Sequence, residues 1–110
     1  CEAEHHVDVL QSELSLWTHD HLTTTLPWCE ANNTVFMAYS PLGRGFLTGT
    51  IKSFDALGEK DGRRNMPRFK PENIGQNTSL IERMQSMAKS KGVTAAQLAL
   101  VRLPAILCSE

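Results

Sequence analysis

Residues 39–49 of this chain read Tyr-Ser-Pro-Leu-Gly-Arg-Gly-Phe-Leu-Thr-Gly and follow an uncharged run, residues 34–38. That run is short, β-branched and aromatic, which is typical of a strand buried on both faces. Pro41 cannot donate to a strand ladder, and three glycines after it allow backbone amides to approach a ligand closely. The pattern predicts a buried strand and then a loop that can hold a phosphate. An ordinary glycine-rich turn is the alternative.

A second short strand is predicted near the N-terminus. Because side chains alternate along a strand, Val7, Val9 and Gln11 fall on one of its faces. Asp8 and Leu10 fall on the other face. We expect Gln11 to end the strand and to point inward.

Between and after these strands the pattern predicts one helix and one long loop. A helix is expected over residues 23–30, with Pro27 in its first turn and Asn32 and Asn33 closing it. Residues 40–76 are rich in glycine and charge and show little periodicity, so we expect them to form a loop. Loops of that length are usually functional or mobile.

Two further helices are predicted in the C-terminal part. From residue 77 to Gly92, apolar residues recur at helical spacing, and these are Leu80, Ile81, Met84, Met87 and Ala88. Thr94 and Gln97 have the spacing of a capping box. That box opens a helix over residues 95–101.

The order strand, helix, strand, long loop, helix, helix predicts an α/β fold with a parallel sheet and helices outside it. In a βα barrel, ligands lie at the C-terminal ends of the strands, and phosphates often bind near the loops after the last two strands. Gln11 and the loop of residues 39–49 both fall at such ends. The sequence therefore places two candidate binding elements at the same rim.

Length and composition limit the fold and its partners. The 110 residues form one domain at most, because a complete (β/α)₈ barrel needs ~250. A net charge of −1 gives no electrostatic reason to expect nucleic acid or an anionic membrane as a partner. No stretch approaches the ~20 apolar residues of a membrane span, and no signal peptide opens the chain. We expect a cytoplasmic protein and, because the chain begins at Cys1, a fragment or partial reading frame.

The cysteines and histidines form no recognisable site. Cys1, Cys29 and Cys108 are odd in number and widely spaced, which argues against a disulfide framework and against a zinc site. Two of the histidines lie beside glutamates near the N-terminus, yet no HExxH spacing supports a metal site, and we expect none. Dinucleotide-binding GxGxxG, phosphate-binding P-loop and GxSxG hydrolase motifs are absent as well.

Two motifs carry a resemblance to a known family. Residues 39–49, together with the Leu-Gln-Ser-Glu-Leu-Ser-Leu-Trp-Thr string of residues 10–18, resemble the aldo-keto reductase superfamily, above all its microbial and plant branch and the potassium-channel β-subunits. The similarity runs from about Val7 to about Val101. It implies a partial (β/α)₈ TIM barrel, about strands 6 and 7 with their helices. Residues 1–110 would then be a C-terminal fragment of a reductase domain.

The resemblance implies NADP(H) as a cofactor and assigns residues to it. The glutamine that corresponds to Gln11 hydrogen-bonds the nicotinamide carboxamide, and the aromatic residue that corresponds to Tyr39 stacks on the nicotinamide ring. The residues that align with the pyrophosphate-holding loop are Ser40, Pro41, Leu42, Gly43 and Arg44. Arg63 matches a basic residue that can also reach the cofactor phosphates.

Each assignment has an alternative. Gln11 is otherwise a polar strand residue that faces solvent, and Tyr39 is otherwise an aromatic residue of the core. Arg63 lies close in sequence to Arg64 and Arg68. A charge cluster of this kind is usually a solvated loop face.

The chain departs from the family at several positions. Leu14 stands where a tyrosine is usual, His19 where an arginine is common, and Thr50 where a lysine often binds phosphate. Residues 102–110 form a divergent tail in which Pro104 should end the last helix. The basic loop that reads the 2′-phosphate of NADP would follow in the family, so the sequence does not choose between NADP and NAD.

The resemblance places no catalytic residue in this chain. In the family, hydride passes from the nicotinamide to a small carbonyl substrate while a tyrosine, assisted by a lysine, an aspartate and a histidine, gives a proton. All four come from earlier strands, and Tyr39 has the stacking role instead. We expect no turnover by this chain alone, and whether it belongs to an active enzyme stays open.

Two further hypotheses concern partners. A non-catalytic NADP-binding module that regulates another protein, as the channel β-subunits do, is the alternative to a reductase. A two-stranded part of a barrel also leaves sheet edges unpaired. Self-association through those edges is therefore expected as the alternative to a poorly ordered chain.

Overall fold

The computed structural model describes residues 4–107, with side chains as far as Leu103. Its strands and helices are β1 Val9–Glu13, α1 Thr25–Ala31, β2 Val35–Tyr39, α2 Pro71–Ser90 and α3 Ala95–Leu107. Five short 3₁₀ turns lie between them, and four of these fall between β2 and α2. The order of elements is the predicted one, and the two strands form a parallel sheet.

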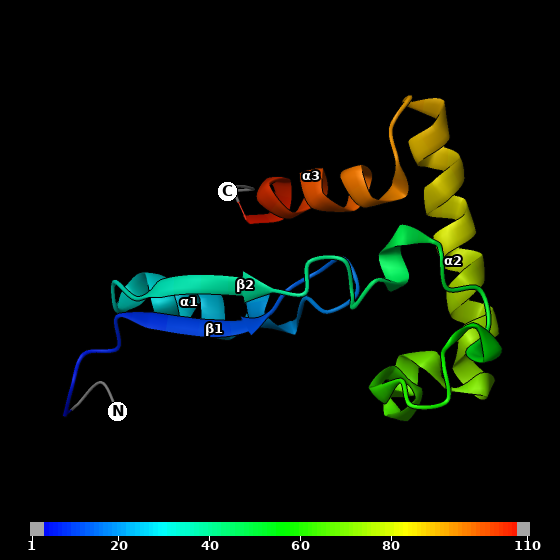
Figure 1. The fold of residues 1–110 in the computed structure, drawn as a ribbon. Coiled ribbons are helices and arrows are strands. Elements are labelled where there is room, and N and C mark those ends of the chain that lie inside the picture. Colours follow the sequence, from blue (N-terminus) through cyan, green and yellow to red (C-terminus); the bar gives the residue numbers. More distant parts are fainter. Residues whose placement is uncertain (1–3, 108–110) are drawn as a thin grey trace.

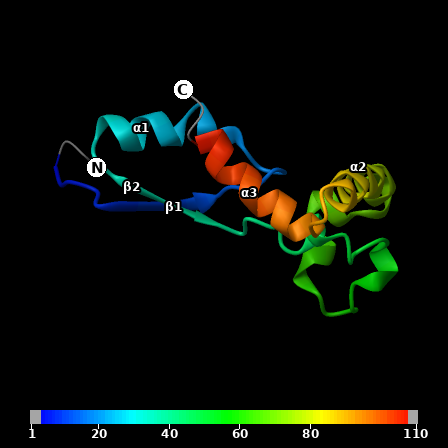
Figure 2. The same ribbon diagram turned by 90° about the horizontal axis from the view of Figure 1, so that it is seen from above.

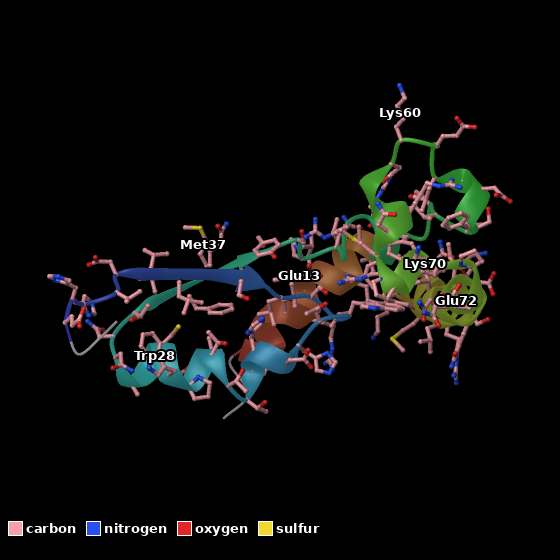
Figure 3. All side chains as sticks on the ribbon, turned by 90° about the horizontal axis from the view of Figure 1, so that it is seen from below. Glu13, Trp28, Met37, Lys60, Lys70 and Glu72 are labelled. Atoms are coloured by element: carbon pink, nitrogen blue, oxygen red, sulfur yellow. The ribbon has the colours of Figure 1, made fainter. Side chains whose placement is uncertain are left out.

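One face of this sheet is covered and the other is open. Helix α1 lies along one face (Figure 2), and Met37 projects from the face opposite the helix that carries Trp28 (Figure 3). Val35 is 61% exposed and Met37 is 49% exposed. The prediction of a strand buried on both faces is wrong for this open face, because no described element packs against it.

Strand β1 is longer at its C-terminal end than predicted. The register pairs Gln11 with Met37, Ser12 with Ala38 and Glu13 with Tyr39. Gln11 therefore lies within the strand rather than at its end. The two additional residues are held by pairing with the last two positions of β2.

Helix α1 confirms the predicted capping. Pro27 is its third residue, in the first turn, where the missing amide costs no helical hydrogen bond. The amide of Asn32 donates to the carbonyl of Trp28 over 3.1 Å. Asn33 adopts a left-handed φ of 55°, a conformation that asparagine tolerates.

Helix α2 begins at Pro71, six residues before the predicted start. Proline suits the first helical position because its φ is already fixed near the helical value. Gly75 and the polar residues around it hid these first turns from the apolar periodicity. Of the predicted apolar face, Leu80 and Met87 are 52% and 55% exposed. The buried residues of α2 are spaced by seven and are Ile74, Ile81 and Ala88.

Helix α3 confirms the capping box but not the predicted end. The amide of Gln97 donates to Oγ1 of Thr94 over 3.1 Å, and the amide of Thr94 donates to Oε1 of Gln97 over 2.9 Å. The helix runs through Pro104 to Leu107, so the prediction that Pro104 ends it is wrong. Proline removes one amide from the helical ladder, and the described part of the helix continues past it through residues 105–107.

The hydrophobic core lies away from the sheet. Phe46 and Phe69 are fully buried, and their rings meet edge to face with centroids 5.3 Å apart. Trp17 contacts Phe46 in the same way at 5.2 Å. The other buried members are Leu47, Ile51, Leu57, Ile74, Ile81 and Ala99. We refer to Phe46, Phe69 and these six residues as the helical core.

The molecule is elongated. Its Cα radius of gyration is 16.4 Å, whereas a compact domain of this length has about 13 Å. Figure 1 shows the sheet and α1 at one end and α2 at the other, with α3 turning back toward the sheet. No helix within residues 4–107 is both long enough and apolar enough to cross a membrane.

Candidate functional site

Gln11 and Tyr39 share the open face of the sheet. Tyr39 lies one pairing position beyond Ala38 and two beyond Met37, the partner of Gln11. Because side chains alternate with a period of two, Gln11 and Tyr39 point to the same side as diagonal neighbours. Gln11 is exposed, and Tyr39 is 37% exposed. The structure thus brings these two predicted residues together on a surface that a ligand can reach.

The chain leaves β2 through a tight turn with left-handed residues. Ser40, Gly43 and Arg44 have φ angles of 51°, 57° and 57°. The amide of Gly43 donates to the carbonyl of Ser40 over 2.9 Å, and the amide of Leu47 donates to that of Leu42 over 3.1 Å. A left-handed conformation costs about 1–2 kcal/mol for a residue other than glycine. The fold therefore enforces the shape of this loop at Ser40 and Arg44.

The predicted loop residues lie together beside Tyr39. Ser40, Pro41 and Leu42 are partly buried, Gly43 is buried and Arg44 is exposed. The guanidinium carbon of Arg44 lies 6.0 Å from the centroid of the Tyr39 ring. Left-handed turns can present backbone amides to anions, and Arg44 adds an exposed positive charge to this loop.

Sequence reasoning did not identify Glu13, which lies at the centre of this region. Its carboxylate is 3.6 Å from Nε of Arg44 and 2.9 Å from Nη1 of Arg68. The hydroxyl of Thr18 donates to the same carboxylate over 3.1 Å. Figure 3 shows Glu13 where β1 ends and the glycine loop, residues 40–49, passes. Alternation places Glu13 on the face of Gln11, and that signal was available in the sequence.

Arg68 is the second residue that sequence reasoning did not identify. Only 18% of its side chain is exposed, and Nη2 donates to the hydroxyl of Thr18 over 3.3 Å. Its buried Nη1 atom makes no hydrogen bond of good geometry among the described residues, so the charge of Glu13 holds it. Nothing in the sequence relates Arg68 to a strand that ends 55 residues earlier.

The side chain of Arg63 supports the glycine loop by donating a hydrogen bond to the backbone of Arg44. Its guanidinium donates to the carbonyl of Arg44 over 3.0 Å and to the carboxylate of Asp61 over 2.6 Å. The hydrogen bonds from the side chain and amide of Arg63 lower the pKa of Asp61 from 3.8 to about 2. The same side-chain hydrogen bond raises the pKa of Arg63. Its contact with cofactor phosphates stays a prediction.

The expectation that the arginine cluster forms a solvated loop face is wrong for Arg64 and Arg68. The guanidinium of Arg64 lies 4.0 Å from the centroid of the Phe54 ring and donates to the carbonyl of Leu57 over 2.7 Å. Arg68 is largely buried. A planar guanidinium can both stack on a ring and satisfy loop carbonyls, and this segment lacks the regular backbone hydrogen bonds that would otherwise satisfy them.

The described residues include one cysteine, Cys29. Cys29 is buried and free, while Cys1 and Cys108 lie outside the described residues. Within residues 4–107, no three side chains of His, Cys, Asp or Glu come together to hold a metal ion.

Comparison with known proteins decides the family. The sequence model described as "Aldo/keto reductase family" matches residues 1–101. This chain belongs to the aldo/keto reductase family. The resemblance carried by residues 10–18 and 39–49 is thereby confirmed.

A solved aldo/keto reductase structure is also similar to this chain. It is titled "Structure of the glycerol dehydrogenase AKR11B4 from Gluconobacter oxydans", and it superposes with a TM-score of 0.71 at 27% sequence identity. The match covers 80% of this chain and 27% of that chain. The present chain therefore spans about a quarter of the length of the structure it matches. Its fold is a small α/β unit with a two-stranded parallel sheet that corresponds to part of a reductase.

Proposed function

We propose that this chain is the cofactor-holding part of an NADP(H)-dependent aldo-keto reductase, equivalent to about strands 6 and 7 of a (β/α)₈ barrel with their helices. The observation that carries the proposal is the pairing register, which puts Gln11 and Tyr39 on one open face. The glycine loop begins directly after Tyr39. Membership in the family and the similarity to the structure of AKR11B4 support the proposal.

Different residues of the proposed site would bind different parts of the cofactor. The side-chain amide of Gln11 would hydrogen-bond the nicotinamide carboxamide, and the ring of Tyr39 would stack on the nicotinamide and fix which of its faces is offered. When bound, the nicotinamide supplies the hydride that reduces a carbonyl. Residues 40–44 would hold the pyrophosphate with backbone amides, the Ser40 hydroxyl and the Arg44 guanidinium. Arg63 would reach the phosphates only by releasing Asp61.

The whole protein would act on small carbonyl compounds or the matching alcohols. This step rests on the family and on the name glycerol dehydrogenase that AKR11B4 carries. Tyr39 is the single tyrosine among the 110 residues and is proposed to stack rather than to give a proton. By itself, the chain would bind the cofactor without turnover.

A fluorescence titration tests cofactor binding. NADPH added to the 110-residue chain should quench Trp17 and Trp28 saturably and accept energy from them. Tyr39→Ala should weaken binding about tenfold, or about 1.4 kcal/mol, through loss of ring stacking. Val35→Ala, on the same face but farther from the loop, is the matched control and should leave affinity unchanged. No quenching at millimolar NADPH would reject the proposal, and a parallel titration with NADH tests the preference for NADP.

The second candidate is the alternative that the resemblance also implies, a non-catalytic NADP-binding module that regulates a partner. The two candidates differ in turnover. Loss of NADPH absorbance on addition of glyceraldehyde, by a longer chain that includes this one, would support the reductase. Tight NADPH binding without that loss would support the module.

We also propose that the protein is cytoplasmic and that the chain associates with itself through its sheet edges. Each strand of the two-stranded sheet has one edge that no described strand pairs with. Unpaired edges are templates for a second chain. Sedimentation velocity over a hundredfold range of concentration should show a dimer, and a concentration-independent monomer would reject this self-association.

A further inference from the structure

We propose that Glu13 is a positioning residue with two unequal arginine partners. It keeps Arg68 under the glycine loop, and it holds Arg44 only until a pyrophosphate takes the place of the Glu13 carboxylate. The identity of the pyrophosphate as part of a dinucleotide rests on the proposed function. The exchange itself requires only phosphate chemistry. The groups involved are the Glu13 carboxylate, the two guanidinium groups and the Thr18 hydroxyl.

The two ion pairs of Glu13 differ in length and in exposure. Arg68 lies 2.9 Å from the carboxylate with 18% of its side chain exposed, and Arg44 lies 3.6 Å away with 36% exposed. Thr18 joins the short pair, because its hydroxyl donates to Glu13 and accepts from Arg68. A short, shielded and shared pair is stronger than a long, solvated one. Arg68 is therefore the fixed partner and Arg44 the exchangeable one.

The fixed pair lies directly beneath the loop. A Cβ atom added to the buried Gly43 would come within 3.7 Å of Nη1 of Arg68. When Arg44 leaves, Glu13 still has the charge of Arg68 and the hydroxyl of Thr18. No buried carboxylate is left unpaired, which is the usual cost of breaking such a contact.

The backbone of Arg44 is fixed while its side chain is exposed. Its φ is 57°, and its carbonyl accepts from Arg63 over 3.0 Å. The guanidinium can therefore turn about its own side-chain bonds without moving the loop. Guanidinium groups bind phosphate oxygens in a bidentate manner. A pyrophosphate carries more charge than a carboxylate that Arg68 already neutralises, so it should win the competition for Arg44.

The test uses inorganic pyrophosphate and the 110-residue chain in isothermal titration calorimetry at low salt. Glu13→Gln removes the competing charge and should tighten pyrophosphate binding by about threefold to tenfold. In an Arg44→Gln background, the same Glu13→Gln change should produce no tightening. Tightening that persists in that background would be a general effect of charge and would overturn the proposal. Unchanged affinity in the Glu13→Gln single variant would also overturn it.

A measurement on the unchanged sequence keeps the test decisive if Glu13→Gln does not fold. In ¹H–¹⁵N spectra of the arginine side chains, pyrophosphate should shift the Nε–Hε signal of Arg44 and leave that of Arg68 in place. Movement of both signals, or of Arg68 alone, would overturn the exchange.

This result and the proposed function can fail separately. Pyrophosphate carries no nicotinamide, so the exchange is seen or rejected whatever NADPH does. NADPH binding that depends on Tyr39 but not on the Glu13 and Arg44 pair would keep the function and reject the exchange. An Arg44 signal that moves with pyrophosphate, in a chain that NADPH does not quench, would keep the exchange and reject the function.

Discussion

The sheet end and the helical end of this molecule are built in opposite ways. At the helical end, Phe46 and Phe69 are fully buried and stacked edge to face. At the sheet end, Val35 and Met37 present about half of their surfaces to solvent. Burial of apolar surface is the main source of stability. The helical end therefore stabilises the fold, while the sheet end leaves one face open to solvent.

The glycine loop joins these two ends. It begins at Ser40, where β2 stops, and it delivers Phe46 and Leu47 into the helical core. The pair of Glu13 and Arg68 connects the strand to the segment that follows this loop. A loop held between the sheet and a packed core has a fixed shape although part of its own surface is solvated.

The largest expected effect is at the centre of the helical core. Phe46→Ala should lower the free energy of unfolding by about 3–5 kcal/mol, because it removes a buried ring and leaves a cavity beside Phe69 and Trp17. Chemical denaturation followed by tryptophan fluorescence and by circular dichroism measures this loss.

The matched variant at the sheet end is Val35→Ala. That side chain is 61% exposed, so its truncation should cost no more than about 0.5 kcal/mol. Equal losses for Phe46→Ala and Val35→Ala would contradict the contrast between the two ends, since they would mean that the open face is covered in solution.

Two glycines give opposite and smaller effects. Gly49 has a φ of 77°, and an added Cβ would overlap the side-chain amide of Gln85, so Gly49→Ala should destabilise by about 1–2 kcal/mol. Gly75 lies in α2 with no atom within 4 Å of an added Cβ, so Gly75→Ala should stabilise by about 0.5–1 kcal/mol. Thermal unfolding of both variants checks the signs. A Gly49→Ala variant as stable as wild type would show that the conformation of Gly49 does not matter, and a destabilised Gly75→Ala variant would contradict the prediction for Gly75.

The sequence predicted the elements with strong local signals. The capping box of Thr94 and Gln97, the asparagines after α1 and the order of strands and helices are local features, and all are found in the structure. The first turns of α2 were missed because Gly75 and polar residues carry no apolar period. The continuation through Pro104 was missed because the loss of one helical hydrogen bond is not enough to stop this helix.

The candidate site shows the same division between local features, which the sequence predicts, and non-local features, which it does not. Gln11, Tyr39 and residues 40–44 were identified from motifs and alternation, and the register places them together. Arg68 could not have been identified in this way. Its place beside Glu13 results from the folding of residues 61–69 back toward β1, and no sequence pattern encodes a contact between residues so far apart in the chain. The exposure of the open face is equally non-local, since it depends on which element covers the strands.

The smallest predicted effect concerns the ion pair of Asp61 and Arg63, the charged clamp that supports the glycine loop. The pKa of Asp61 is lowered from 3.8 to about 2 by its hydrogen bonds with Arg63. A lowered folded-state pKa stabilises the protein above the unfolded value, and that contribution is lost as the pH falls through the folded value. The charged side chain should therefore make wild type more stable than Asp61→Asn above pH 3.8, and the difference should vanish as the pH approaches about 2.

Carboxyl ¹³C NMR of Asp61 follows the same titration directly, and Arg63→Gln is its control. Removal of the guanidinium should return the pKa of Asp61 toward 3.8. A midpoint near the ordinary value in the wild-type chain would show that the clamp is open in solution. The carbonyl of Arg44 would then lose its support, and the fixed loop backbone on which both the pyrophosphate site and the exchange at Glu13 depend would not exist.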